Sequence, residues 1–373
     1  MLPRRCGLAT FTADLMKSVQ GVSPETNCIQ VSMTDGPTGG DTSSVFISPQ
    51  ESAGYHRAAR ALNRADIDLL CIQHEYGIYG GPDGELLLEL LERVKAPVVV
   101  TLHTVLDRPS PNQRRVMDAI LGHAAKVVVM TNHSAKIMRD THGVTASQLR
   151  VVPHGIPSPP AMGRAAGRHM LNVGTRPLLL TFGLLSPGKG IEHVIHALPK
   201  IVSRCPGLLY IVLGVTHPNL LREHGEAYRE SLEQLADTLG VRDNVRFLNR
   251  FVDMPELTGA LAATDIYVTP YVNEAQSVSG TLAYSYGLGT AVVSTPYRHA
   301  VELLADGRGS LVPFADPEAI AAAVTGLLAD PARLAAIRSA ARAAGREMVW
   351  PRVGARYLDI FREAVPAPLA LHA

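Results

Sequence analysis

The stretch that decides the fold is residues 265–295, DIYVTPYVNEAQSVSGTLAYSYGLGTAVVST. It begins and ends with short apolar runs, 265–270 and 290–295, that are continuous rather than alternating. Such runs are typical of strands buried on both faces. The segment between them is almost uncharged and rich in serine, threonine and glycine, and we expect a helix to begin near Ser279. Strand, helix and strand in this order predict a parallel α/β sheet with right-handed crossovers.

The same alternation recurs along most of the chain. Ten strands are too many for one ordinary doubly wound sheet, and residues 154–176, rich in proline and glycine, lack periodicity. We therefore expect two α/β domains, 1–160 and 161–348, and a C-terminal segment, 349–373, whose helix closes the core or crosses back to the first domain. A single (β/α)₈ barrel is the competing layout. The other apolar runs are 68–73, 97–103, 126–131, 149–155, 177–183, 208–214, 244–249 and 309–314.

Composition excludes several classes of protein. The net charge of +1 gives no electrostatic footprint for nucleic acid. The four cysteines (Cys6, Cys28, Cys71 and Cys205) are scattered, which argues against a zinc site or disulfide framework and suits a reducing compartment. No apolar run reaches the roughly 18 residues of a membrane span, and the N-terminus lacks a secretion signal. We expect a cytoplasmic protein without a resident metal, and leave peripheral membrane contact open.

Two loops of the second half have the composition of anion sites. Ligands of open α/β sheets bind beyond the carboxyl ends of the strands. The loop FGLLSPGKG, residues 182–190, places Gly183 and Lys189 before a helix, where N–H groups and an ammonium can hold phosphate. It is not a Walker A loop. The alternative is a turn with a solvated lysine.

The second loop is part of the opening stretch. Ser279, Gly280 and Thr281 offer hydroxyl and N–H groups at a helix N-terminus, a surface that suits a diphosphate. Glu274 and Gln276, just ahead, can bind sugar hydroxyls. An ordinary N-cap with polar neighbours remains the alternative.

Three loops of the first half are weaker candidates. Gly7 opens a helix-like run, and His103 ends a buried strand in TLHT. His74, Glu75 and Tyr76 follow another strand, where a polar aromatic ring suits carbohydrate because it combines an apolar face with a hydrogen-bonding tip. For all three loops, simple packing is the alternative.

Seven collinear segments resemble the retaining glycosyltransferases of family 4, which have the GT-B fold. The resemblance implies two facing Rossmann-like domains, with a nucleotide-sugar donor held mainly by the second and the acceptor by the first. It also implies that no metal or other cofactor is needed and that the C-terminal helix returns to the first domain. The segments are CGLATFTADL, TLHT, VVPHG, FGLLSPGKGIEHVIHAL, VRFLNRFV, ATDIYVTPY…GLGTAVVSTPYRHAVELL and GSLVPFADPEAIAAAV.

The resemblance carries over residue by residue. Gly7 falls on a glycine whose loop backs the donor phosphates, and His103 on a histidine near the transferred sugar. Lys189 matches the phosphate-binding lysine that follows Gly183. The arginine that normally follows the glycine is absent, because Leu184 stands there.

Further positions depart from the family pattern. Aligning GLGTAVV puts Gln276 and Tyr284 where two glutamates normally touch the donor sugar and the ribose. Glu274 lies two residues upstream of Gln276 and could substitute for the first glutamate. The remaining expected donor contacts are Arg250, Phe251 and Glu302.

The resemblance implies transfer of a hexosyl group, with retention, from a donor such as GDP-mannose or UDP-glucose to a sugar or glycan hydroxyl. Attack occurs on the front face, and the departing phosphate helps to deprotonate the acceptor. The protein acts by positioning and by stabilising leaving-group charge. Three alternatives remain: a glycoside phosphorylase, a sugar-nucleotide epimerase, and a non-catalytic two-domain sugar-binding protein, which the missing glutamates favour.

The start of the chain differs from the family pattern. The family begins with a strand before its glycine loop, whereas Gly7 here follows MLPRRC, which is not a strand sequence. We expect that the natural start lies upstream or that the chain was trimmed.

Overall fold

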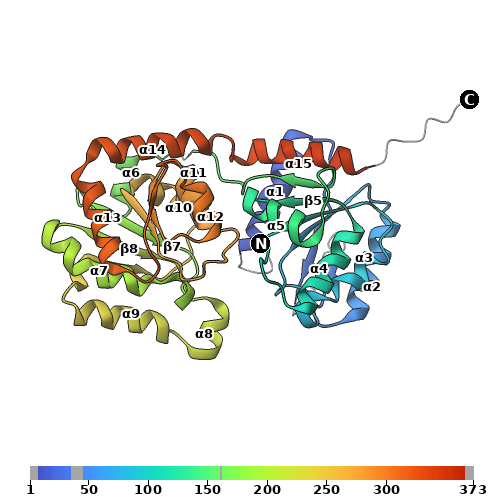
Figure 1. The fold of residues 1–373 in the computed structure, drawn as a ribbon, viewed down its shortest axis with the longest axis horizontal. Helices are drawn as coiled ribbons and strands as arrows, with labels where there is room; N and C mark the ends of the chain where they lie inside the picture. Colours follow the sequence, from blue (N-terminus) through green and yellow to red (C-terminus); the bar gives the residue numbers. More distant parts are fainter. Residues whose placement is uncertain (1–6, 35–44, 160–161, 366–373) are drawn as a thin grey trace, which may run out of the picture. The chain divides into compact units, whose positions relative to one another are not determined.

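The computed structural model describes residues 7–34, 45–159 and 162–365. The chain forms two compact units: unit 1 is Met1–Gly155 with Trp350–Ala373, and unit 2 is Ile156–Val349. Sequence analysis placed the divisions after residues 160 and 348. Each unit has its own open parallel sheet, so the single-barrel layout is wrong. Figure 1 shows both units as ribbons.

Unit 1 is built on a four-stranded parallel sheet of order β3-β4-β5-β6 and a separate parallel pair, β1-β2. The four sheet strands were predicted. The pair was not, because segments of three residues are too short to show periodicity. The strands are β1 (Val31–Met33), β2 (Val45–Ile47), β3 (Leu70–His74), β4 (Val98–Leu102), β5 (Ala124–Val129) and β6 (Leu149–Val151). The helices are α1 (Gly7–Val22), α2 (Ser52–Arg64), α3 (Leu87–Leu91), α4 (Pro111–His123), α5 (Asn132–His142) and α15 (Trp350–Ala364).

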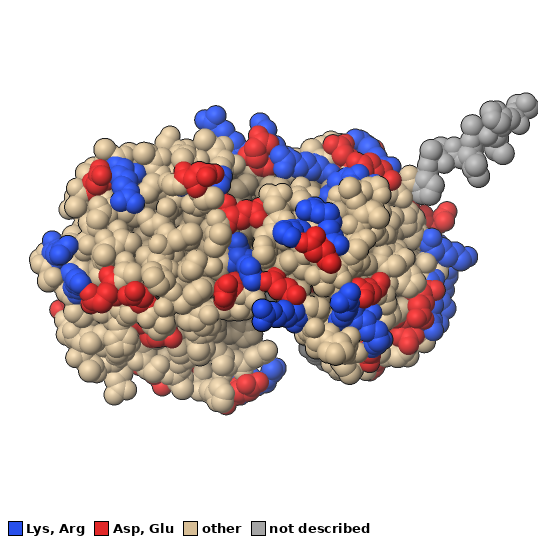
Figure 2. All heavy atoms as spheres, viewed as in Figure 1, with Lys and Arg blue, Asp and Glu red and all other residues tan. Residues whose placement is uncertain are grey.

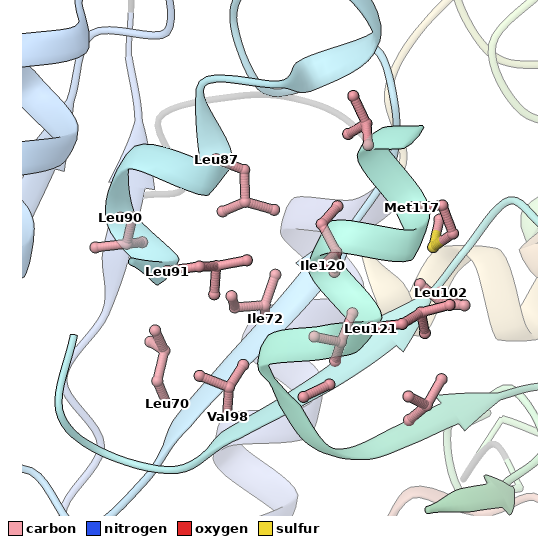
Figure 3. Close-up of a cluster of buried hydrophobic side chains, with 14 of the residues drawn as sticks. Leu70, Ile72, Leu87, Leu90, Leu91, Val98, Leu102, Met117, Ile120 and Leu121 are labelled. Carbon is pink, nitrogen blue, oxygen red and sulfur yellow. The ribbon is translucent and has the colours of Figure 1, made fainter. Parts of the chain in front are cut away.

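The core of unit 1 forms where α3 and α4 cover the sheet. Leucine, isoleucine and valine side chains of the strands meet apolar side chains of the two helices (Figure 3). Burial of apolar surface contributes about 25 cal/mol per Å² and is the main term that holds these layers together. The labelled members are Leu70, Ile72, Val98 and Leu102 of the sheet, Leu87, Leu90 and Leu91 of α3, and Met117, Ile120 and Leu121 of α4.

An apolar cavity of about 150 Å³ lies in unit 1 and is lined by side chains of β1, β3, α1 and α3. Within the described residues, β1 pairs only with β2, and β3 only with β4. Strand edges normally find a partner or a cover, since their N–H and C=O groups are otherwise unpaired. The expectation of a strand ahead of Gly7 concerns residues 1–6 and beyond, which lie outside the described residues.

Helix α15 belongs to unit 1, where it packs against α1. The Ser18 hydroxyl donates to the carbonyl oxygen of Trp350, and the hydroxyl oxygens of Thr101 and Tyr357 lie 3.0 Å apart. The sequence predicted this helix, with Pro351 in its first turn, where a missing N–H costs nothing. The segment after unit 2 therefore completes the fold of unit 1.

Unit 2 contains a six-stranded parallel sheet of order β12-β11-β10-β7-β8-β9. All six strands were predicted. The strands are β7 (Leu178–Phe182), β8 (Leu209–Leu213), β9 (Val245–Leu248), β10 (Ile266–Thr269), β11 (Ala291–Ser294) and β12 (Ser310–Leu311). The helices are α6 (Arg164–Met170), α7 (Ile191–Arg204), α8 (Pro218–His224), α9 (Ala227–Thr238), α10 (Met254–Ala263), α11 (Gly280–Gly287), α12 (Arg298–Leu303), α13 (Pro317–Ala329) and α14 (Pro331–Gly345).

Helices cover both faces of this sheet, and successive strand residues alternate between two cores. Leu179 joins the apolar cluster that includes α7 and α13, whereas Leu178 and Leu180 join the cluster that includes α10 and α11. Strand order reverses between β7 and β10, which is the switch point of a doubly wound sheet. With both faces covered, the strand ends are the part of the sheet left to a ligand.

The distribution of surface charge agrees with the sequence. On the face shown in Figure 2, basic and acidic side chains are interspersed, as the net charge of +1 suggests.

Among the described residues, no single helix combines the length and apolar character needed to cross a bilayer. Only α13 and α14 together, bent by 99°, meet those criteria of length and composition.

The contact between α14 and α11 requires glycine. A Cβ added to Gly345 would lie 1.9 Å from the carbonyl oxygen of Gly287. We expect Gly345→Ala to reduce the free energy of unfolding by about 1–3 kcal/mol, because backbone must shift to admit the methyl group. Gly326→Ala, in α13 with nothing within 4 Å of the added Cβ, is the matched control and should stabilise by up to about 1 kcal/mol. Thermal melts of the two variants check this, and equal melting temperatures would contradict it.

Candidate functional site

The candidate site lies at the switch point of unit 2, where the loops after β7 and β10 meet. Gly190 lets them approach: its φ of +63° is in the left-handed region, and a Cβ there would lie 2.2 Å from the carbonyl oxygen of Pro270. A side chain at this position would therefore separate the two loops. The glycine brings Lys189, which precedes it, against the segment that leads into α11.

Lys189 is the last residue of a 3₁₀ turn, Pro187–Lys189, and its side chain is half-buried. Its Nζ lies 2.7 Å from the Tyr271 hydroxyl oxygen and 4.0 Å from the centre of the Tyr271 ring. An ammonium over an aromatic face is attracted by the ring quadrupole. The structure therefore gives Lys189 a fixed place at the switch point, and a turn with a fully solvated lysine is not what it shows.

The N-terminus of α11 lies beside this lysine. Ser279 is the N-cap, and its hydroxyl oxygen accepts from the N–H of Leu282 at 3.3 Å. Thr281 Oγ1 is 2.8 Å from the Tyr271 hydroxyl oxygen, and the N–H of Ser279 donates to Nδ1 of His299 at 2.8 Å. The first N–H groups of a helix have no partner within the helix, so those of Gly280 and Thr281 can bind an anion.

Tyr271 was missed by the sequence analysis, although it directly follows the predicted strand 265–270. Only 3% of it is exposed, and its ring stacks on that of Tyr297 with centres 5.0 Å apart. Burial opposes ionisation, but the nearby Lys189 ammonium and the hydrogen bonds that Tyr271 shares with Lys189, Ser279 and Thr281 outweigh burial and lower the pKa of Tyr271. A tyrosine after an apolar strand resembles any core aromatic, so only the contact with Lys189 marks it.

The two candidates for sugar contact differ in exposure. Glu274 has an exposed side chain, and its backbone carbonyl accepts from the N–H of Arg298 at 3.1 Å. Gln276 is half-buried, and its side-chain amide donates to the carbonyl of Val278 at 2.6 Å. One donor of Gln276 is thus used within its own loop, while the carboxylate of Glu274 faces solvent.

The other predicted donor contacts lie at different places in unit 2. Tyr284 is only 7% exposed and belongs to the apolar core around α11. Glu302 lies in α12 and is half-buried. Arg250 follows β9, two strands from the switch point, and forms an ion pair with Glu256, while the neighbouring Phe251 is 48% exposed. Gly183, by contrast, lies at the site with Lys189, since a Cβ there would lie 3.1 Å from the Thr281 side chain at the N-terminus of α11.

In unit 1, His103 lies at the end of β4 and is buried. Its Nε2 is 2.8 Å from Oε1 of Gln73, and the ring of Phe11 meets it edge-on with centres 4.8 Å apart. Phe11 makes the same kind of contact with His154, at 5.1 Å. Gly7 begins α1, and a Cβ there would meet nothing within 4 Å.

The expected acceptor residues surround the end of β3. His74 is fully buried, and within the described residues neither ring nitrogen has a hydrogen-bond partner. His74 therefore exposes no surface through which the expected contact with an acceptor could form. Glu75 accepts from the Thr104 hydroxyl at 2.6 Å, and burial raises the pKa of its carboxyl group. The ring of Tyr76 packs edge-on to His74 at 5.0 Å, so Glu75 and Tyr76, both half-buried, remain the candidates.

Comparison with known proteins agrees with this arrangement. The family model of the glycosyl transferases group 1 matches residues 176–330, and that of glycosyltransferase family 4 matches residues 46–158. The chain belongs to the family 4, group 1 glycosyltransferases. In the described part of the chain, no group of three or more His, Cys, Asp or Glu side chains could hold a metal ion. That this glycosyltransferase needs no metal remains a prediction.

Among curated relatives, a D-inositol 3-phosphate glycosyltransferase of Xylanimonas cellulosilytica is 28% identical over 295 residues, 73% of this chain and 68% of the relative. A GDP-mannose-dependent alpha-(1-6)-phosphatidylinositol monomannoside mannosyltransferase of Mycolicibacterium smegmatis is 28% identical over 263 residues, 67% of this chain and 65% of the relative. The chain thus spans about two thirds of the length of these relatives.

Solved structures show the GT-B fold. Sucrose-phosphate synthase of Thermosynechococcus elongatus has a TM-score of 0.77 and 18% identity, and the match covers 96% of this chain and 93% of that one. Anabaena HepE, solved with UDP and glucose, has a TM-score of 0.74 and 18% identity, covering 96% of this chain and 97% of that one. At this identity the similarity concerns the fold alone.

The buried histidines of unit 1 predict a pH-dependent stability. Burial lowers the pKa of His103 to about 3, with nearby His154 and His74 adding to the effect, and burial lowers those of His74 and His154 to about 4. Since an unfolded histidine has a pKa of about 6.5, the unfolded state binds more protons below that pH. The stability that these neutral rings provide is present above pH 6.5 and is lost as pH falls toward 4, by about 2 kcal/mol per histidine at pH 5.

Urea unfolding between pH 5 and 8 measures this effect. Trp350, the only tryptophan, lies in unit 1, so its fluorescence reports the unfolding of that unit. His154→Gln, which cannot titrate, should flatten the dependence of unfolding free energy on pH by about one proton. At pH 8, where the wild-type ring is neutral in both states, the variant serves as its own reference. If the unfolding free energy of His154→Gln depends on pH as steeply as that of wild type, the lowered pKa of His154 is contradicted.

Proposed function

We propose that the protein transfers a hexosyl group, with retention, from a nucleotide-sugar donor of the GDP-mannose or UDP-glucose type to a hydroxyl group of a sugar or glycan. The observation that carries this proposal is the position of Lys189 beside the N-terminus of α11, at the switch point of unit 2. The names of the relatives support it, since one uses GDP-mannose and another glycosylates an inositol phosphate. Nucleic acid is not an expected partner.

The charge balance of the site suits a diphosphate leaving group. Lys189 is the only basic residue in the segments 183–190 and 270–281, because Leu184 occupies the arginine position of the family. The N–H groups at the start of α11 supply the remaining positive potential, which contributes about 0.3–1 kcal/mol and up to about 2 kcal/mol when partly buried. These groups act most strongly when charge develops on the departing phosphate.

The proposed step breaks the bond between the anomeric carbon and the donor phosphate oxygen and forms one to the acceptor oxygen. The acceptor proton goes to the departing nucleoside diphosphate, which serves as the base. No metal is required in this proposal. Glu274 binds donor hydroxyls with Gln276 as its competitor, and in unit 1 we assign His103 to the transferred sugar and Glu75 and Tyr76 to the acceptor.

A second candidate function is nucleotide-sugar binding without turnover. It is favoured by Gln276 and Tyr284, which stand where the family has glutamates, and by the use of the Gln276 amide within its own loop. Incubation with UDP-glucose or GDP-mannose and a panel of sugar and inositol phosphate acceptors separates the two. Release of nucleoside diphosphate that depends on the acceptor supports transfer. Binding without release supports the second function, and release of sugar 1-phosphate with inorganic phosphate supports a phosphorylase.

Lys189→Ala tests the phosphate assignment. We expect at least a tenfold loss of kcat, because the variant removes the only basic residue of segments 183–190 and 270–281. Lys200→Ala is the matched control: Lys200 lies in α7, is exposed, and pairs with Glu318 on the surface. Steady-state kinetics of both variants decide the point, and equal rates for wild type and Lys189→Ala would remove Lys189 from the site.

Glu274→Ala and Gln276→Ala test the sugar contact. A charge-assisted hydrogen bond contributes about 1.5–3 kcal/mol, so loss of the Glu274 carboxylate should lower kcat/KM roughly 10- to 150-fold. Gln276→Ala should cost less, because that side chain offers only neutral hydrogen bonds. Measuring kcat/KM for both variants decides between them. A larger loss in Gln276→Ala would assign the sugar contact to Gln276.

A further inference from the structure

We propose that Tyr271 is the positioning residue that holds Lys189 in place for the donor phosphates. The inference rests on the proposed function, which it deepens by adding a residue that neither the family match nor the sequence analysis assigns. Tyr271 follows β10 directly, whereas Lys189 follows β7, so the contact between them bridges the switch point.

The direction of the hydrogen bonds follows from the chemistry of lysine. A protonated ammonium group donates and cannot accept, so the Tyr271 oxygen accepts from Lys189. Its single proton then goes to Thr281 Oγ1, 2.8 Å away, since the Ser279 hydroxyl, at 3.5 Å, is itself a donor to the Tyr271 oxygen. A directed chain therefore runs from Lys189 through Tyr271 to the first turn of α11. It couples the lysine to the helix N-terminus that supplies the other anion-binding groups.

The tyrosine is fixed from several sides. Its ring stacks on Tyr297 with 16° between the ring planes, and its backbone carbonyl accepts from the Thr295 hydroxyl at 2.6 Å. The ring therefore cannot move with the lysine. It defines one position for the ammonium group and uses one of its three N–H donors, which leaves two for phosphate oxygens.

Positioning has value here because Lys189 is the only basic residue of segments 183–190 and 270–281. An unrestrained lysine loses side-chain entropy when a ligand immobilises it, and a side chain already held in place loses less. Leu184 provides no second cation in the loop after β7. The rigid contact with Tyr271 fixes the position of the Lys189 ammonium group, as the planar guanidinium of the missing arginine would fix its own charge. It does not replace the charge of that arginine.

The opposite role is the main competitor. If Tyr271 instead occupies the ammonium group that the donor needs, it acts as a latch that the diphosphate must displace. The two roles predict opposite signs: loss of the hydroxyl weakens diphosphate binding if Tyr271 positions Lys189, and strengthens it if Tyr271 competes for Lys189.

Tyr271→Phe separates them, because it removes the hydroxyl and keeps the stacked ring. Titration calorimetry with UDP and GDP should give a dissociation constant roughly 3- to 10-fold larger than in wild type, because Tyr271→Phe loses only the positioning of Lys189 and keeps the ammonium group itself. Uridine and guanosine, which lack phosphate, should bind with unchanged affinity. Tyr357→Phe, which removes a buried hydroxyl of unit 1 that lies 3.0 Å from Thr101 Oγ1, is the matched control and should leave diphosphate affinity unchanged.

A double-mutant cycle shows whether Tyr271 acts through Lys189. In the Lys189→Ala background, Tyr271→Phe should cause no further loss of affinity, since the group that it positions is gone. Unchanged or tighter binding by Tyr271→Phe would overturn the inference, and so would an equal loss in both backgrounds.

Two further outcomes are decisive. If wild type binds neither UDP nor GDP, the proposed function fails and the inference fails with it; if wild type binds and Tyr271→Phe binds equally, only the inference fails. If Tyr271→Phe does not fold, Thr281→Val, which removes the acceptor of the tyrosine proton at nearly constant shape, is judged by the same cycle and the same criteria.

Discussion

The strands of both units are parallel, the central ones are buried on both faces, and the rest of the architecture depends on this constraint. Every residue of β8, β10 and β11 is buried. Parallel strands need crossover helices, which then cover the sheet and leave only its ends to a ligand. In unit 2 the reversal of strand order between β7 and β10 sends the helices that follow them, α7 and α11, to opposite faces of the sheet, and the candidate site forms at that point.

At this point the protein combines few charges with many backbone dipoles. One ammonium group, at Lys189, lies beside the hydroxyl groups and free N–H groups that begin α11. A helix N-terminus attracts an anion without the desolvation that a second buried cation would require. This economy distinguishes the chain from the family pattern, in which an arginine follows the glycine of the β7 loop and glutamates precede and follow the start of α11.

The sequence allowed much of the fold to be predicted, and the reasons are local. The six strands of unit 2 and four of unit 1 lie in continuous apolar runs, and Pro351 lies in the first turn of α15. Strands β1 and β2 were missed because three residues carry no period. Lys189 and the start of α11 could be chosen as site candidates from the distinct composition of their loops, and their roles stay predictions. The burial of His74 and Tyr284 could not be read from their neighbours in sequence.

By itself, the sequence determined the α/β class, the strand–helix order and the two glycine-rich loops, because backbone propensity and apolar periodicity act over a few residues. Tertiary structure alone decided that Lys189 meets Tyr271, that Gly345 packs against Gly287, and that α15 completes unit 1. Each of these contacts joins residues far apart in the chain, so strand order and packing create it. The local sequence around one partner of such a contact therefore does not indicate the other partner.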